Sequence, residues 1–320
     1  MATITPWRDN AITVDVDTPG ISVDIVVVSY NSEDTLHDCV APFSRRPDAR
    51  VIVVDNDSTD ASLASLADLD VTTIAAEVNR GFAAGCNIGY RAGTAPFVLF
   101  LNPDARAEPE LIGRLRDVLT AAPGAGAVAP RILDEEGHLD YSLRRFPRRR
   151  STFAQALFLH RALPQATWVD EVVRDPAAYE HAWSPDWVSG ACLLVRRSVL
   201  EQIGGFDEGY FHYSEDTDLC RRIRDAGFDI RYEPSAVVVH LGGRSTPRPA
   251  LLPTLAAARV RYVRRHDGRA AAELERIGVG LGAATHLAVG RGGMEQRRGH
   301  GRALLRMVRG VPDVIDSPNG

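Results

Sequence analysis

The sequence has no lysine, few cysteines and no long apolar run. Its 37 basic residues are all arginines, so it lacks the glycine- and lysine-bearing phosphate loop that nucleotidyltransferases typically use. The four cysteines are widely spaced without a C-x-x-C pair, which argues against a zinc ribbon or a disulfide framework and for a reducing compartment. No stretch reaches the roughly 18 apolar residues of a membrane span, and no secretory signal pattern opens the chain. We therefore expect a cytoplasmic protein.

The first 130 residues alternate short apolar runs with helical segments. Continuous β-branched runs that end in polar turns are typical of buried parallel strands, and this alternation indicates βαβ units. We expect helices from Glu33 and over Ala61–Leu69, the second capped by Ser58 or Thr59. The expected strands are Val23–Ser29, Val51–Val54, Val71–Ala75 and Phe97–Leu101. The sequence therefore predicts an α/β fold with a doubly wound, mostly parallel sheet.

No dinucleotide fingerprint follows the first strand, where Ser29-Tyr30-Asn31 stands in place of G-x-G-x-x-G, and no Walker-type loop is present. Ligands of such sheets bind at the carboxyl ends of the strands, and those ends carry polar residues here. These residues are Asp55, Asn79, Arg80, Asn102 and Asp104. Such a set suits a nucleotide whose phosphates are held by a metal and arginine. Asn102-Pro103-Asp104 alone is equally compatible with a simple turn.

The second half of the chain carries further acidic and imidazole groups next to expected elements. A strand is expected over Trp187–Arg197, with Ser198 capping the next helix, and two short strands over Phe228–Tyr232 and Ala236–Val239.

Glu215 and Asp216 open another expected helix, whose exposed amides favour an ionised carboxylate, as a general base requires. A plain N-cap is the alternative for Asp216. His240 directly follows a strand and either shares a metal with Asp104 or is structural.

Charge is unevenly distributed along the chain. From Arg244 onward there are 14 arginines and 6 acidic residues, whereas the preceding part carries 23 and 36. Residues 144–150 hold a dense arginine run, which is either a solvated face or a clamp for a phosphate-bearing substrate. Residues 160–186 show no periodicity and predict a long loop. Ile277–Val289 is apolar but too short and glycine-rich to span a bilayer, so it packs on the domain or lies on a membrane.

Five motifs occur in order: Val-Asp-Asn-x-Ser, Asn-x-Gly-Phe-Ala-x-Gly-x-Asn, Asn-Pro-Asp, Gly-Gly-Phe-Asp and Glu-Asp-x-Asp-Leu. Together they resemble the inverting glycosyltransferases of family 2, within their bacterial rhamnosyltransferase-like branch. The resemblance spans about residues 22–246. It implies a GT-A fold with a nucleotide-binding half (22–130) and an acceptor half (131–246), preceded by a lead-in (1–21) and followed by a basic helical region (247–320).

The resemblance also assigns roles to individual residues. Asp216 matches the catalytic base, and Asp104 matches the metal-binding aspartate, with Asn102 in place of that motif's usual first aspartate. His240 matches a further metal or diphosphate contact. The residues expected at the nucleotide are Tyr30, Asp55, Asn56, Asn79 and Arg80. The residues expected at the acceptor are Trp187, Gly190 and Glu215.

The implied activity is transfer of a sugar from a dTDP- or UDP-sugar, with Mg²⁺ or Mn²⁺ as cofactor. The implied acceptor is a glycan or polyprenyl-diphosphate-linked sugar of bacterial surface polysaccharide synthesis, with rhamnose as the leading donor sugar. The basic regions suit peripheral contact with an anionic inner membrane surface, and no nucleic-acid partner is expected. The alternatives are a nucleotidyltransferase acting on sugar phosphates and an inactive nucleotide- or lipid-binding module.

Overall fold

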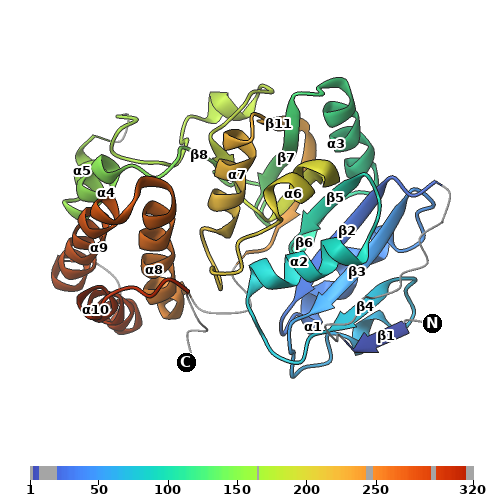
Figure 1. Ribbon diagram of the computed structural model, residues 1–320, viewed down its shortest axis with the longest axis horizontal. Helices are drawn as coiled ribbons and strands as arrows, with labels where there is room; N and C mark the ends of the chain where they lie inside the picture. The colour runs from blue at the N-terminus through green and yellow to red at the C-terminus, as the bar shows by residue number, and fades with distance from the viewer. Residues whose placement is uncertain (1–2, 7–19, 164–165, 243–247, 290–292, 315–320) are drawn as a thin grey trace.

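A nine-stranded sheet forms the centre of the molecule (Figure 1). The computed structural model describes residues 3–6, 20–163, 166–242, 248–289 and 293–314. In spatial order the strands are β1 (Thr3–Pro6), β4 (Thr72–Ala75), β3 (Ala49–Asp55), β2 (Val23–Ser29), β5 (Phe97–Leu101), β10 (Cys192–Arg196), β7 (Ala125–Leu133), β11 (Asp229–His240) and β6 (Ala105–Arg106). The short strands β8 (Leu143–Arg144) and β9 (Trp187–Val188) form a separate antiparallel pair.

The expected mostly parallel, doubly wound architecture is confirmed. Strands β1 to β5 pair in parallel, as do β7 and β11, whereas β10 runs antiparallel to both β5 and β7. All seven residues of β2 are buried, as expected for a strand covered on both faces. Strand β1 lies within the segment taken from sequence as a loose lead-in and pairs with β4 at the sheet edge.

Helices cover both faces of this sheet. On one face, α1 (Glu33–Val40) and α3 (Glu110–Ala121) bury their leucine and isoleucine side chains against the strands. On the other face lie α2 (Phe82–Ala92), α6 (Arg197–Ile203) and α7 (Glu215–Asp225). The two apolar layers fix the sheet, so the carboxyl ends of β2, β3 and β5 meet along one edge.

Two expected features between residues 187 and 198 differ from the structure. The segment expected as one strand over Trp187–Arg197 is divided at residues 189–191, because β9 pairs with β8 and only β10 belongs to the central sheet. The expected Ser198 cap is wrong, because α6 already begins at Arg197. The guanidinium of Arg197 donates to the buried carboxylate of Asp24 (2.7 Å), and this ion pair anchors the start of the helix.

Two further expectations also differ from the structure. The helix expected over Ala61–Leu69 is reduced to one 3₁₀ turn, Ala64–Leu66, because Asp60 accepts the N–H of Ser62 (3.1 Å) and holds the chain in a local turn. The two expected strands after residue 228 are one strand, β11. Its pairing with β7 shifts register between Glu233 and Val237, around a proline that has no N–H to donate.

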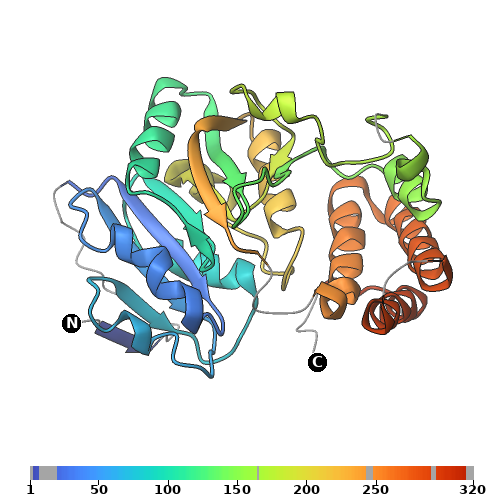
Figure 2. The same ribbon diagram turned by 180° about the vertical axis from the view of Figure 1, so that it is seen from behind.

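The C-terminal region is helical, as expected. Helices α8 (Arg248–Asp267), α9 (Arg269–Val289) and α10 (Met294–Arg309) pack together and against α4 (Arg149–Ala156) and the short α5 (Leu159–Ala162) at one end of the molecule (Figure 2). Arg259 on α8 donates to Glu171 (2.6 Å) and to Glu275 on α9, so buried ion pairs join the helices to the loop before β9. Among the described residues, none of the helices is long and apolar enough to cross a membrane.

Candidate functional site

A cluster of metal-capable side chains lies where β5 and β11 end. Asp104 follows β5, and His240 is the last residue of β11, whose pairing with β6 sets His240 opposite Ala105. The imidazole Nε2 of His240 lies 3.1 Å from Asp104 Oδ1 and 3.2 Å from Asn102 Nδ2. Burial opposes protonation of His240, but the hydrogen bond and charge of Asp104 outweigh it and raise the pKa of the imidazole. The structure therefore brings together the two residues expected at the metal, Asp104 and His240, with Asn102, which was expected at the nucleotide's phosphates.

The donor atoms of this cluster fit a divalent cation that takes mixed ligands. A carboxylate and an imidazole already converge, and both Asp104 and His240 are largely buried, with exposed side-chain fractions of 16% and 18%. Two protein ligands leave room for phosphate oxygens, as is usual for Mg²⁺ and Mn²⁺ at nucleotides. Oxygen and nitrogen together favour Mn²⁺ over Mg²⁺. A second group of possible metal ligands follows β7 and does not include Asp104 or His240. It comprises Asp134, Glu136 and His138 and is largely exposed.

The carboxylates of Glu215 and Asp216 stand at the start of α7. The two preceding residues, Tyr213 and Ser214, have φ angles of 73° and 65°. Consecutive left-handed residues with side chains are strained, and the strain sets the direction in which the helix begins. Asp216 Oδ1 accepts from the N–H of Thr217 (2.7 Å) and Oδ2 from the N–H of Gly190 (3.1 Å). The helix start therefore presents Asp216 to the segment between β9 and β10.

The two neighbouring carboxyl groups differ in environment. Burial and the charge of Asp216 raise the pKa of Glu215 to about 8, and Glu215 Oε2 is buried without a hydrogen-bond partner. Burial also raises the pKa of Asp216, but the N–H groups of Gly190 and Thr217 partly offset that rise. Glu215 is thus kept protonated inside the protein, whereas Asp216 is partly buried and its ionised form is supported by two backbone N–H groups. A base of raised pKa suits proton abstraction near neutral pH.

One short segment connects Asp216 to the metal-capable cluster. Gly190 donates its N–H to Asp216, and the next residue, Ala191, accepts a hydrogen bond from the N–H of Asn102 (2.9 Å). The break between β9 and β10, which the sequence did not reveal, is what makes both contacts possible. Residues 190 and 191 therefore link the start of α7 to the end of β5, next to Asp104.

The expected nucleotide residues lie at the ends of β2 and β3. Tyr30 is 38% exposed and follows β2, while Asp55 is almost fully buried at the end of β3. Asp55 Oδ2 accepts from the N–H of Ser58 (3.0 Å), and Oδ1 has no partner among the described residues. A buried carboxylate oxygen without a donor is costly unless a ligand supplies one. Asp55 therefore has the free acceptor that a nucleobase N–H requires.

Asn56 and Asn79 hold the loop that enters α2. The amide of Asn56 donates to Asn79 Oδ1 (2.9 Å), which also accepts from the N–H of Gly81 (2.9 Å). The neighbouring Arg80 pairs with Glu208 (3.0 Å) of the Gly-Gly-Phe-Asp turn region. Asn56 and Asn79 therefore shape the nucleotide-side loop through their own hydrogen bonds, and Arg80 stays half-exposed beside Glu208, a partner that sequence reasoning missed.

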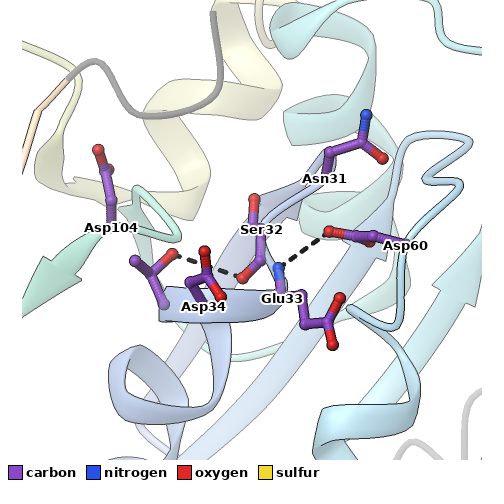
Figure 3. Close-up of a pocket in the computed structure, with 7 residues that line it drawn as sticks. Asn31, Ser32, Glu33, Asp34, Asp60 and Asp104 are labelled. Carbon is purple, nitrogen blue, oxygen red and sulfur yellow. Dashed lines mark hydrogen bonds between the residues drawn. The ribbon is translucent and has the colours of Figure 1, made fainter.

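An acidic pocket adjoins Asp104 at the start of α1 (Figure 3). The N–H of Glu33 donates to Asp60 Oδ2 (3.1 Å) across it. The pocket is lined by Asn31, Ser32, Glu33, Asp34, Thr35, Asp60 and Asp104. This concentration of carboxylates repels a diphosphate unless a cation lies between them. The acidic lining of the pocket is therefore consistent with a divalent cation at Asp104 and His240.

Helix α8 contacts α7 through Asp218, a connection that no sequence motif indicated. Asp218 is fully buried and its carboxylate contacts Arg265 (3.0 Å), His266 (2.8 Å) and Arg222 (2.7 Å). Although burial opposes it, these partners lower the pKa of Asp218. Two of the three come from the C-terminal helical region, so that region holds the helix that carries Asp216.

Sequence comparisons place this chain among known proteins. The model for "Glycosyl transferase family 2" matches residues 24–204. The chain is 32% identical over 307 residues to the N-acetylglucosaminyl-diphospho-decaprenol L-rhamnosyltransferase of Mycobacterium tuberculosis, covering 89% of this chain and 97% of that protein. It is 30% identical over 155 residues to rhamnosyltransferase WbbL of Escherichia coli, covering 47% of this chain and 54% of that protein.

Solved structures share the fold. The mannosyltransferase PcManGT from Pyrobaculum calidifontis, in complex with GDP-Man and Mn²⁺, aligns with a TM-score of 0.55 at 19% identity, covering 92% of this chain and 88% of that one. Staphylococcus aureus TarS 1-349 in complex with UDP aligns with a TM-score of 0.53 at 14% identity, covering 91% and 81%. The expected GT-A architecture is confirmed.

Proposed function

The chain belongs to glycosyltransferase family 2, and from this premise we propose that it transfers a sugar, with inversion, from a nucleoside diphosphate sugar. The acceptor is a hydroxyl of a glycan or of a polyprenyl-diphosphate-linked sugar in bacterial cell-surface polysaccharide synthesis. The similarity to a rhamnosyltransferase named for a decaprenol-linked acceptor supports dTDP-rhamnose as the first donor to test, with UDP-sugars next.

The observation that carries this proposal is that the Gly190–Ala191 segment contacts both Asp216 and Asn102, a member of the metal-capable cluster. A displacement at an anomeric carbon needs a base on the acceptor side and charge neutralisation on the leaving-group side. Asp216, whose pKa is raised by burial, supplies the first. The cluster of Asp104, Asn102 and His240 supplies the second.

The reaction then follows as one displacement. Asp216 accepts the proton of the acceptor hydroxyl, and the acceptor oxygen bonds to the anomeric carbon on the face opposite the diphosphate. The bond from that carbon to the diphosphate oxygen breaks, and the nucleoside diphosphate leaves. Asp104 and His240 would hold a divalent cation, which supplies Lewis-acid stabilisation of the leaving diphosphate. Asp55 offers its free Oδ1 to the base of the nucleotide.

Three parts of the chain divide this work in the proposal. Residues 22–130 bind the nucleotide, residues 131–246 bind the acceptor and carry the base, and residues 247–320 support the catalytic helix and contact the membrane. Trp187, Gly190 and Glu215 belong to the acceptor half. Tyr30, Asn56, Asn79 and Arg80 belong to the nucleotide half.

Contact with the inner face of the plasma membrane is proposed for one surface of the helical region. Its exposed apolar side chains follow helical spacing on the two packed helices α9 and α10, and exposed arginines of α10 lie beside them. We call this surface the outer helical face; it comprises Leu274, Ile277, Leu281, Leu305 and Val308. Apolar side chains with neighbouring arginines suit the interface of an anionic bilayer.

The activity is tested by incubating the purified chain with dTDP-rhamnose or UDP-sugars and a short-chain prenyl-diphosphate-linked N-acetylglucosamine. Reactions contain Mn²⁺, Mg²⁺ or EDTA, and the product's anomeric configuration is read by NMR. Metal-dependent transfer with a configuration opposite to that of the donor is expected. Retention of configuration, or full activity in EDTA, would overturn the mechanism, and transfer of a nucleotide instead of a sugar would overturn the function.

A further inference from the structure

Arg144 occupies an unusual place within the basic run 144–150. It lies in β8 directly opposite Trp187 of β9, and its guanidinium carbon lies 5.5 Å from the centre of the Trp187 ring system. The side chain is half-buried. Within the described part of the chain, the guanidinium of Arg144 makes no ion pair and no hydrogen bond. Its stacking on Trp187 holds it in place without neutralising its charge.

Other arginines of the same run are already engaged. Arg145 donates to the carbonyl of Val172, Arg148 approaches Asp186 (3.9 Å), and Arg149 approaches Asp267 (3.7 Å). Those contacts fit the interpretation of a structural or solvated face for that part of the run. A half-buried cation without a counter-ion is unfavourable in the free protein, so Arg144 fits the alternative, a group reserved for an anionic ligand.

Arg144 is placed next to the proposed catalytic base. Trp187 precedes Gly190 by three residues, and Gly190 donates its N–H to Asp216 Oδ2 (3.1 Å). The positive charge of Arg144 acts on Asp216 and is one of the influences that lower the pKa of that carboxyl against its burial. Arg144 and Trp187 therefore lie close enough to Asp216 for the charge of Arg144 to act on that carboxylate.

The residues proposed for the donor's diphosphate are a different set. They are Asp104 and His240, which lie 3.1 Å apart, and Arg80, which pairs with Glu208 at the nucleotide-side loop. We therefore expect an anion bound by Arg144 to belong to the acceptor, since Arg144 lies near the proposed base and not among the residues proposed for the donor's diphosphate.

We propose that Arg144, stacked on Trp187, binds a phosphate of the diphosphate that links the accepting sugar to its prenyl chain. This inference rests on the proposed function and specifies its acceptor as an anionic, diphosphate-linked sugar. The planar guanidinium can donate two parallel hydrogen bonds to phosphate oxygens. The indole keeps the guanidinium in that orientation and offers an apolar wall to the first part of the prenyl chain.

The test compares two acceptors and two variants. One acceptor is N-acetylglucosamine on a short prenyl diphosphate, and the other is the same sugar on an uncharged alkyl chain of equal length. The variants are Arg144→Gln and, as matched control, Arg150→Gln, because Arg150 is an exposed arginine of the same run. Binding of each acceptor is measured by isothermal titration calorimetry alongside KM and kcat for both substrates.

We expect Arg144→Gln to raise the KM and dissociation constant of the diphosphate acceptor at least about tenfold, the range of a charge-assisted pair. The donor's KM and the weaker use of the uncharged acceptor should stay within about twofold. Arg150→Gln should leave all of these values unchanged.

Three results would overturn the inference. They are a rise in the donor's KM alone, equal losses with both acceptors, and no change with either. The binding data separate this inference from the proposed function. If the wild-type chain transfers no sugar but binds the diphosphate acceptor in an Arg144-dependent manner, the function fails and the subsite stands. If the wild-type chain transfers sugar and Arg144→Gln binds the diphosphate acceptor normally, the function stands and the subsite fails.

Discussion

Asp216 is the residue on which the proposed chemistry depends most directly. Asp216→Asn keeps the shape of the side chain but cannot accept a proton, so we expect kcat to fall by about 10²- to 10⁴-fold. Donor binding, measured by calorimetry with a nucleoside diphosphate and Mn²⁺, should be unchanged. Asp225→Asn on the same helix, whose carboxylate pairs with Arg221 at the surface, serves as control. Near-normal turnover of Asp216→Asn would show that another group is the base.

The protonation state of Glu215, the neighbour of Asp216, can be tested through the free energy of unfolding. Its pKa is raised to about 8 by burial and by Asp216, so the folded protein keeps a proton that the unfolded chain loses near pH 4.5. The folded state therefore binds more protons between about pH 4.5 and pH 8, and stability falls as pH rises through that window, by at most about 1.4 kcal/mol per pH unit.

Glu215→Gln removes this titration, so its free energy of unfolding should rise relative to the wild type as pH increases. Urea unfolding at about pH 5 and about pH 8 measures the difference between the two proteins, which cancels the contributions of other groups. A difference that does not change with pH would mean that Glu215 is ionised in the folded protein.

Asp104 is expected to control metal-dependent donor binding. Asp104→Ala removes the carboxylate ligand and leaves His240 alone, so we expect the affinity for UDP or dTDP in Mn²⁺ to fall about tenfold or more, towards the value in EDTA. Thermal-shift titrations measure this, because a ligand that binds only the folded state raises its melting temperature. Asp134→Ala, in the separate exposed group, is the control. Equal metal dependence in Asp104→Ala and the wild type would place the cation elsewhere.

At the residue scale, strand ends and motifs were enough to place Asp104, Asn102, His240 and Asp216. The meeting of Asp104, Asn102 and His240 depends on the ordered alternation of strands and helices, which the sequence displays. The sequence did not distinguish Arg144 from the other arginines of residues 144–150. Its proposed role depends on which of these arginines pair with carboxylates or carbonyls. That depends on contacts between β8, β9 and α7, which no local pattern encodes.

At the element scale, a backbone contact connects the nucleotide-binding half of the site to the acceptor half. Phe82 donates its N–H to the carbonyl of Phe211 (2.9 Å), and Gly81 lies against the same carbonyl with φ of 90°. A Cβ at Gly81 would overlap that oxygen. This contact sets the loop before α2 against the turn that leads to α7.

Gly81→Ala should therefore cost more than the left-handed backbone alone. Gly137 has nearly the same φ, 83°, with open space where a Cβ would stand, so Gly137→Ala isolates the backbone cost of about 1–2 kcal/mol. We expect Gly81→Ala to lose at least about 2 kcal/mol more in urea unfolding. Equal losses in the two variants would show that the loop moves away from Phe211 at no cost.

Elements were predicted best where burial alone decides them. Strands β2 and β5 match the expected bounds because each is a continuous apolar run that is covered on both faces of the sheet. The helix expected after β3 failed because Asp60 and Ser62 satisfy the backbone locally, and β11 was divided at its bulge. In both cases side-chain or proline effects on single hydrogen bonds overrode the apolar pattern.

At the scale of the whole molecule, the helical region serves both ends of the proposed reaction. Its inner side holds α7 through the contacts of Arg265 and His266 with Asp218. Its helices α9 and α10 carry the outer helical face. Removing residues 247–320 would therefore disturb the catalytic helix as well as any membrane contact, so membrane binding has to be tested with point variants of the full chain.

Membrane binding should need both the apolar side chains and the arginines of the outer helical face. We expect the full chain to sediment with phosphatidylglycerol liposomes but not with phosphatidylcholine liposomes. Raising NaCl from about 0.05 M to about 0.5 M should release most of it, because the charge attraction is screened.

The double variant Ile277→Asp with Val308→Asp should stay in the supernatant yet retain transfer to a water-soluble acceptor, because both side chains are more than half exposed, at 56% and 72%. Val78→Asp, 55% exposed on the sheet side of the molecule, is the matched control and should still sediment. If the double variant sediments like the wild type, the outer helical face is not the membrane surface. The acceptor would then have to reach Arg144 and Asp216 from another side of the molecule.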